Sequence, residues 1–183
     1  MQSLKHQSVL IVGGSRGLGL GVVEALAAHD ANVTVIARDA ARLTDLKARL
    51  GVSVIAGDAT DPSLAESAIR EVRPSVLVLN AGATPVISPL HKQTWESFSR
   101  NWETDVKATF HWIQAALKVP LPRGSRVLIS SSGAAIAGSP LSGSYAGATW
   151  LRTGQTCFHD ARPRRRQHRR EAQDVEENQR RYC

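Results

Sequence analysis

Residues 8–19, SVLIVGGSRGLG, decide the fold of this 183-residue chain. The stretch opens with an apolar run of strand length, Ser8–Val12, and continues into three glycines spaced Gly-x-x-x-Gly-x-Gly, namely Gly13, Gly17 and Gly19. An apolar helical pattern follows directly. A glycine loop between a strand and a helix lets the backbone approach a pyrophosphate and aims the N-terminus of the helix at it. The stretch therefore predicts the first strand–helix unit of a nucleotide-binding domain, with a plain turn as the structural alternative.

Downstream of this unit, short apolar runs alternate with helical patterns. The runs are apolar almost throughout, which is typical of strands covered by helices on both faces. The predicted strands are Ser8–Val12, Asn32–Ala37, Val52–Ala56, Val76–Asn80 and Arg126–Ser131. The predicted helices are Leu18–His29, Ala40–Leu50, one that begins at Asp61-Pro62, and one from about Gln93 to Leu117. This order predicts an α/β fold, a doubly wound parallel sheet with five recognisable strands.

Three further motifs follow in register. Gly57-Asp58-Ala59 comes after the third predicted strand, Leu79-Asn80-Ala81-Gly82 closes the fourth, and Ile129–Gly133 closes the fifth. Ser132 precedes Tyr145 by thirteen residues. With these motifs in this order, the chain resembles the short-chain dehydrogenase/reductase family over most of its length. The resemblance implies a Rossmann-like fold and an NAD(P)-dependent oxidoreductase.

The cofactor positions of that family correspond to a defined set of residues in this chain. They are Gly13, Ser15, Arg16, Gly17, Leu18, Gly19, Arg38, Asp58, Ala59, Asn80, Ala81 and Gly82. The resemblance gives Asp58 a hydrogen bond to the adenine.

Charge favours NADP over NAD at this predicted site. A carboxylate at the tip of the second strand would accept hydrogen bonds from the ribose and repel a 2′-phosphate. Ala37 occupies that tip, and Arg38 and Arg16 offer guanidiniums that suit a 2′-phosphate. Asp39 is the alternative ribose partner, and it would favour NAD.

The catalytic positions of the family are only partly matched. In the family a Tyr exchanges a proton with the substrate oxygen, a Ser holds that oxygen, a Lys binds the nicotinamide ribose, and an Asn completes a proton relay. The resemblance places Tyr145 and Ser132 in the first two roles. Thr149 stands in the Lys position and Asp105 in the Asn position. Because a free tyrosine, with a pKa of about 10, is a poor base at neutral pH, the loss of the Lys predicts impaired catalysis.

The composition changes near residue 150. Residues 150–183 hold nine arginines, no lysine and five acidic residues, and they contain no predicted strand. We therefore predict an NAD(P)-binding domain over 1–149 and a basic, Arg-rich tail over 150–183 that is disordered or irregular. The abrupt change after Thr149 favours the hypothesis of a truncated or frame-shifted product whose sheet is incomplete at its C-terminal side. The arginine run invites a nucleic-acid-binding hypothesis, but no folded motif surrounds it.

Composition excludes several other classes. The chain is 42% hydrophobic and 21% charged with a net charge of +7, which is typical of a globular domain. Its two cysteines give no disulfide framework and fit a reducing cytoplasm, where we expect the protein to be located. Its apolar runs fall short of the roughly 20 residues of a membrane span, and its start lacks the pattern of a signal peptide. The histidines show no metal-ligand spacing, so we expect no metal site.

We expect an oxidoreductase that moves a hydride between NADP(H) and a small-molecule carbonyl or alcohol, with Tyr145 as general acid/base and Ser132 orienting the substrate oxygen. The alternative is a catalytically impaired nucleotide-binding remnant, because of Thr149 and an unrecognisable C-terminal substrate region. A third hypothesis is a basic interaction protein that acts through its tail. Homo-oligomers are typical of the family, and the helix that would form the dimer interface is not recognisable here.

Overall fold

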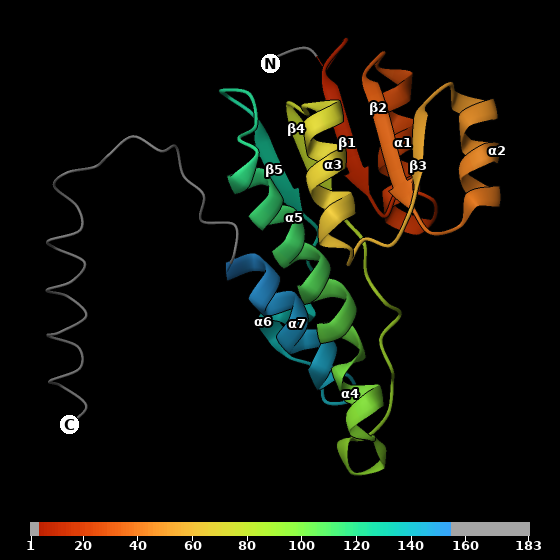
Figure 1. Cartoon of the computed structure of the whole chain (residues 1–183). Coiled ribbons are helices and arrows are strands. Elements are labelled where there is room, and N and C mark those ends of the chain that lie inside the picture. Colours follow the sequence, from red (N-terminus) through yellow and green to blue (C-terminus); the bar gives the residue numbers. More distant parts are fainter. Residues whose placement is uncertain (1–3, 155–183) are drawn as a thin grey trace, which may run out of the picture.

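Five parallel strands form one sheet in the computed structural model, which describes residues 4–154 (Figure 1). The strands are β1 (Ser8–Val12), β2 (Asn32–Ala37), β3 (Ser53–Ala56), β4 (Val76–Leu79) and β5 (Arg126–Ile129). Their order is β3-β2-β1-β4-β5, so the chain winds outward from β1 to β3 and then crosses to β4 on the other side of β1. The predicted doubly wound α/β fold is confirmed. In such sheets, ligands bind at the carboxyl ends of the strands beside this reversal.

Helices cover both faces of the sheet. They are α1 (Gly17–Ala28), α2 (Ala40–Leu50), α3 (Pro62–Val72), η1 (Leu90–Lys92), α4 (Trp95–Asn101), η2 (Trp102–Val106), α5 (Lys107–Lys118), α6 (Ala134–Ala137) and α7 (Gly143–Gly154). On one face, Val23 of α1 and Leu43 of α2 are buried against β1 and β2. On the other face, Ile69 of α3 and the fully buried Trp112 of α5 pack on β1 and β4. The strands are apolar throughout because both of their faces are covered.

Capping residues set the ends of two predicted helices. Asp39 accepts a hydrogen bond from the backbone N–H of Arg42 (3.0 Å) and begins α2, which ends at Gly51 in the left-handed conformation. Asp61 accepts a hydrogen bond from the N–H of Ser63 (2.8 Å) and begins α3. The predicted start of α3 and both ends of α2 are therefore confirmed.

The long helix predicted from about Gln93 to Leu117 is interrupted. The segment consists of α4, the π-helical turn η2 and α5 in succession. Thr94 begins α4 through a capping box with Ser97. In η2 the wider turn changes the hydrogen bonding, and the hydroxyl of Thr109 donates to the carbonyl oxygen of Asp105 (2.8 Å). The prediction of one regular helix was wrong because the apolar pattern does not record the contacts that Asn101 and Asp105 make at this turn with Ala83, 18 and 22 residues earlier.

The predicted domain boundary after Thr149 falls inside a helix. α7 continues to Gly154, and the side chains of Thr149 and Arg152 are buried against the domain. The rest of the predicted basic tail, and the nucleic-acid hypothesis that depends on it, lie outside the described residues. None of the described helices is long and apolar enough to cross a membrane.

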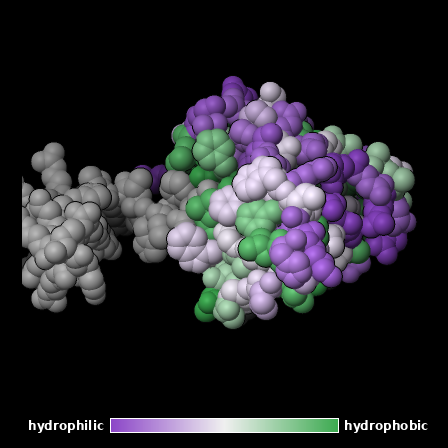
Figure 2. All heavy atoms as spheres, turned by 90° about the horizontal axis from the view of Figure 1, so that it is seen from below, coloured by the Kyte–Doolittle hydropathy of each residue, from purple (hydrophilic) through white to green (hydrophobic). Residues whose placement is uncertain are grey.

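Apolar side chains are exposed at the end of the molecule that carries α4, α6 and α7. Figure 2 looks at this end from below and shows apolar patches between polar ones. The large exposed apolar side chains in and beside these helices are Ile87, Leu90, Trp95, Ile136, Leu141 and Trp150. This apolar end borders the site described next, because α7 also carries Tyr145.

Candidate functional site

The glycine loop connects β1 to α1 in a conformation that only glycine adopts easily. Gly13 and Gly17 have φ angles of +88° and +55°, in the left-handed region. A Cβ on Gly13 would lie 2.5 Å from the backbone nitrogen of Ala81, so the loop touches the segment that follows β4. α1 begins after Arg16, and no side chain caps its first turn. The backbone N–H groups of that turn are therefore suited to an anionic ligand.

Asn80 joins the glycine loop to the two neighbouring strand ends. Its Nδ2 donates to the carbonyl oxygen of Gly13 (3.0 Å), and its Oδ1 accepts a hydrogen bond from the hydroxyl of Ser130 (2.7 Å). Gly19 packs against the same group, since a Cβ there would overlap the carbonyl oxygen of Gly13 and lie 2.6 Å from Nδ2 of Asn80. Gly19 and Asn80 thus hold the glycine loop in its position.

A cleft of about 650 Å³ opens at the carboxyl ends of the strands, in the size range of ligand pockets. The predicted site residues that line it are Gly13, Ser15, Arg16, Gly17, Leu18, Arg38, Asp58, Ala59, Asn80, Ala81, Gly82, Asp105, Tyr145 and Thr149. Two predicted residues, Gly19 and Ser132, are not among the lining residues. The structure therefore brings most of the predicted site together around one cavity.

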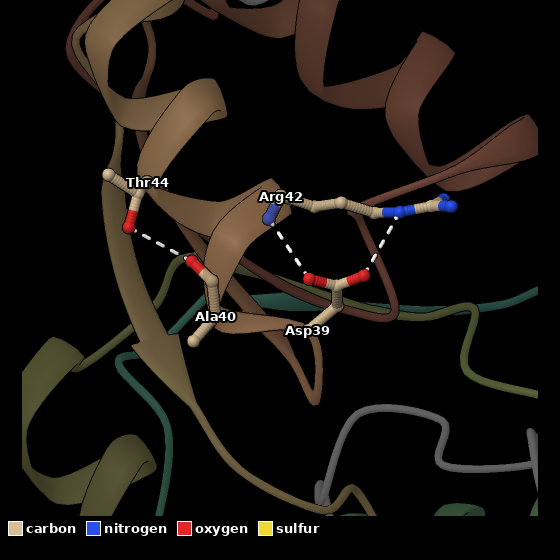
Figure 3. Close-up of polar contacts among 4 residues, drawn as sticks. All are labelled: Asp39, Ala40, Arg42 and Thr44. Atoms are coloured by element: carbon tan, nitrogen blue, oxygen red, sulfur yellow. Dashed lines mark hydrogen bonds and ion pairs between the residues drawn. The ribbon is translucent and has the colours of Figure 1, made fainter.

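Three arginines line one end of the cleft. Arg16 follows the glycine loop, Arg38 follows β2, and Arg42 lies in the first turn of α2. Asp39 caps α2 with Oδ1, and its Oδ2 pairs with Nε of Arg42 at 3.1 Å (Figure 3). The charge of Asp39 is thus offset by Arg42, which the sequence analysis did not identify. Arg42 could have been predicted from its position three residues after the N-cap Asp39, because residues three apart on a helix are close enough for their side chains to pair.

Asp58 lies in the loop after β3, at the same end of the cleft. Its Oδ1 accepts hydrogen bonds from the backbone N–H (2.8 Å) and the hydroxyl (2.9 Å) of Thr60. The hydrogen bond from the N–H of Thr60 holds the pKa of Asp58 below its usual value, and the charges of Arg38 and Lys107 act in the same direction. The carboxylate is therefore ionised near neutral pH.

Tyr145 and Thr149 of α7 line the opposite end of the cleft. The hydroxyl of Thr149 is turned back to its own helix, within 2.8 Å of the carbonyl oxygen of Tyr145 and 3.0 Å of that of Ala146. Threonine carries no charge, and its hydroxyl here donates within its own helix rather than to the cleft. Ser132 lies two residues before α6, and its hydroxyl accepts a hydrogen bond from the N–H of Ala134 (3.3 Å). Ser130 and Ser131 line the cleft instead.

Asp105 is a buried carboxylate in the π-turn η2. Its Oδ1 accepts a hydrogen bond from the N–H of Ala83 (2.7 Å), and its Oδ2 accepts one from Nδ2 of Asn101 (3.2 Å). Burial raises the pKa of Asp105, while these two hydrogen bonds and the charge of Arg152 act in the opposite direction. The carboxylate thus holds the loop after β4 against the helix. π-Turns often occur at functional sites.

Arg152 is the second charged lining residue, after Arg42, that the sequence analysis missed. It lies one helical turn after Thr149, and its Nη2 donates to the carbonyl oxygen of Leu79 at the end of β4 (3.0 Å). Burial lowers the pKa of Arg152, while Asp105 and Tyr145 act to raise it. Its helical spacing from Tyr145 was the available signal, but the compositional break placed it in the tail.

A family model for short chain dehydrogenases matches residues 7–151. The chain belongs to the short-chain dehydrogenase family. The match extends over all five strands and most of α7, so the predicted resemblance is confirmed for the whole of the sheet described above.

Individual relatives agree with this assignment. L-xylulose reductase of Homo sapiens is 30% identical over 122 residues, which are 66% of this chain and 50% of that protein. The chain therefore spans about half the length of this curated relative. A short-chain dehydrogenase of Burkholderia cenocepacia J2315, solved in complex with NADP, superposes with a TM-score of 0.72 and is 26% identical. The superposition covers 85% of this chain and 67% of that one. A blue fluorescent protein from a metagenomic library, solved with NADPH, gives a TM-score of 0.70 at 30% identity, over 84% of this chain and 67% of that one.

Proposed function

We propose that this chain binds NADP(H) in the cleft and acts as an oxidoreductase on a small-molecule carbonyl or alcohol. The observation that carries the proposal is the cleft itself, which joins a glycine loop and three arginines at one end to Tyr145 at the other. The loop fits a dinucleotide because side chains are excluded where the backbone must approach a pyrophosphate. A Cβ on Gly13 would strike Ala81, and the first turn of α1 has no side-chain cap. The solved relatives with NADP or NADPH support the same ligand.

The arginines support NADP over NAD. Arg16, Arg38 and Arg42 line one end of the cleft, and Asp39, the alternative partner for a ribose, is engaged with Arg42. A 2′-phosphate would accept hydrogen bonds from the guanidiniums, each worth roughly 1.5–3 kcal/mol. NAD lacks this phosphate and would offer Arg16 and Arg38 no anionic group to bind.

The reaction end of the cleft supports acid–base chemistry. When bound, the nicotinamide supplies or accepts the hydride. We assign Tyr145 as the general acid/base at the substrate oxygen, since it lines the cleft half-buried. We assign Ser132 to the orientation of that oxygen, on its spacing from Tyr145 and its place directly after Ser131. The name of the human relative, a reductase of a ketose, supports a carbonyl or alcohol substrate.

A binding experiment tests the proposal before any substrate is known. Calorimetric titration should give a lower Kd for NADPH than for NADH, and Arg38→Asp should reverse this order by weakening NADPH about 10- to 100-fold. Arg123→Asp, at an exposed position away from the cleft, makes the same charge change and should leave both affinities unaltered. Equal Kd values for the two dinucleotides in the parent chain would refute the assignment. NADPH oxidation at 340 nm with a panel of carbonyls then tests turnover.

A second candidate function is nucleotide binding with little turnover. The observation that favours it is the hydroxyl of Thr149, which bonds its own helix and gives the reaction end no cation at that position. This candidate predicts an ordinary NADPH affinity without oxidation by any carbonyl of the panel. The tail-based interaction hypothesis, the cytoplasmic location and the homo-oligomer stay predictions.

A further inference from the structure

Arg152 presents a buried charge with an unused hydrogen-bond donor. The residue is only 4% exposed, and its Nη2 donates to the carbonyl oxygen of Leu79. Its Nε is buried and has no hydrogen-bond partner among the described residues. Leaving a buried charged donor unpaired is costly, and native proteins seldom do so without a reason. The guanidinium is therefore positioned for an acceptor that the protein itself does not provide.

The surroundings of Arg152 define what that acceptor is. Arg152 lines the reaction end of the cleft together with Asp105, Tyr145 and Thr149. Asp105 acts on it electrostatically, but no ion pair joins the two among the described residues. A second carboxylate at this place would be repelled by Asp105. A hydroxyl group suits both neighbours, because it accepts from the guanidinium and donates to a free lone pair of the carboxylate.

We propose that Arg152 is the cationic ligand-binding residue at the reaction end of the cleft, and that its Nε donates to a hydroxyl oxygen of the ribose that carries the nicotinamide. This inference rests on the proposed function, since it presupposes a dinucleotide in the cleft. The same chemistry is available from a hydroxyl or carbonyl oxygen of the substrate, and the experiment separates the two sources.

The assignment also accounts for the two departures from the family pattern. Thr149 removes a cation from α7, and Arg152 restores one on the same helix, one turn further along. Asp105 introduces a negative charge, and Arg152 is the cation whose field acts on it. Arg152 therefore supplies a cation on the helix where Thr149 has none, and it partly offsets the charge of Asp105.

Ligand fragments locate the contact without any turnover. The full chain is titrated calorimetrically with NADPH, with 2′-phospho-ADP-ribose, which retains the second ribose, and with 2′-phospho-ADP, which lacks it. Arg152→Met should weaken NADPH and 2′-phospho-ADP-ribose about 10- to 100-fold and change 2′-phospho-ADP less than twofold. Arg123→Met is the matched control and should change none of the three. Arg152→Gln keeps an N–H donor and serves where Met disturbs the fold, with unchanged 2′-phospho-ADP binding as the criterion of folding.

The outcomes are distinct. A parent chain that binds none of the three ligands overturns the proposed function itself. A parent that binds all three, with Arg152 variants that bind them equally well, overturns only the role of Arg152. Unchanged dinucleotide binding combined with a raised KM for the carbonyl assigns the contact to the substrate and overturns the ribose assignment.

Discussion

Two glycines of α1 provide a matched test of how the nucleotide loop is held. Gly19 and Gly21 lie in the same helix, two residues apart. A Cβ on Gly19 would overlap the carbonyl oxygen of Gly13 and lie 2.6 Å from Nδ2 of Asn80, whereas a Cβ on Gly21 would meet nothing within 4 Å. Alanine is favoured over glycine in a helix interior by about 1 kcal/mol. Gly21→Ala should therefore stabilise the protein by about this amount.

Gly19→Ala gains the same helical preference but forces the loop away from Asn80. Overpacking of this kind costs typically 1–3 kcal/mol, and here the obstacle is backbone, which yields less readily than a flexible side chain. The net change should therefore be destabilising despite the gain in helix propensity, and the two variants should differ by roughly 1–3 kcal/mol in their free energies of unfolding.

Urea unfolding followed by circular dichroism measures this difference. With a slope of roughly 1–3 kcal/mol per molar urea, the two midpoints should be separated by about 1 M, with the midpoint of Gly19→Ala the lower. NADPH titration should show weaker binding for Gly19→Ala and parental binding for Gly21→Ala. Equal midpoints with equal NADPH affinities would refute the reasoning, because the close packing behind the loop would then have no energetic effect.

Three further changes address the buried polar groups and a helix cap. Because burial raises the pKa of Asp105, the ionised carboxylate destabilises the fold as pH rises from the ordinary value of 3.8 through the raised pKa. The Tm of Asp105→Asn should therefore exceed that of the parent by an amount that grows as pH rises from about 4 to 7. A difference in Tm that does not change with pH would contradict this. Trp112→Phe removes the hydrogen bond from Nε1 to the carbonyl oxygen of Ala59 (2.9 Å) and should lower the free energy of unfolding in urea by about 1–3 kcal/mol. An unchanged urea midpoint would mean that water replaces the indole N–H as the donor to this carbonyl oxygen. Asp61→Ala removes the cap on the N–H of Ser63 and should cost about 1 kcal/mol, with Asp61→Asn recovering most of it in the same assay.

The sequence predicted those parts of the fold that local chemistry determines. The five strands were found because each is a short apolar run between polar or glycine boundaries, and all observed ends lie within two residues of the predicted ones. α2 was predicted from its apolar pattern and the start of α3 from its N-cap, and in both helices the N-cap side chain bonds a backbone group two or three residues away. Such contacts are local, so the residues that make them lie close together in the sequence.

The features that were missed depend on contacts between distant segments. The π-turn around Asp105 is accompanied by hydrogen bonds to Ala83, 22 residues earlier, which no local pattern records. Arg152 was assigned to the tail because composition is averaged over a window, whereas its burial results from a bond to Leu79, 73 residues away. Ser132 was assigned from its place in the Ile129–Gly133 motif and its spacing to Tyr145, and this pattern did not predict that Ser130 and Ser131 also line the cleft.

The bond between Asn80 and Gly13 joins residues 67 positions apart, and this separation bears on how the protein folds. β1 can pair with β2 early, because only α1 lies between them, but its other edge stays open until α2, β3 and α3 have been made. Contacts of such long range are formed slowly, and an open strand edge is prone to associate with other chains in the meantime. The cleft exists only after β4 has docked on β1. A ligand of the cleft should therefore slow unfolding of the finished protein without accelerating the step that builds its own binding site.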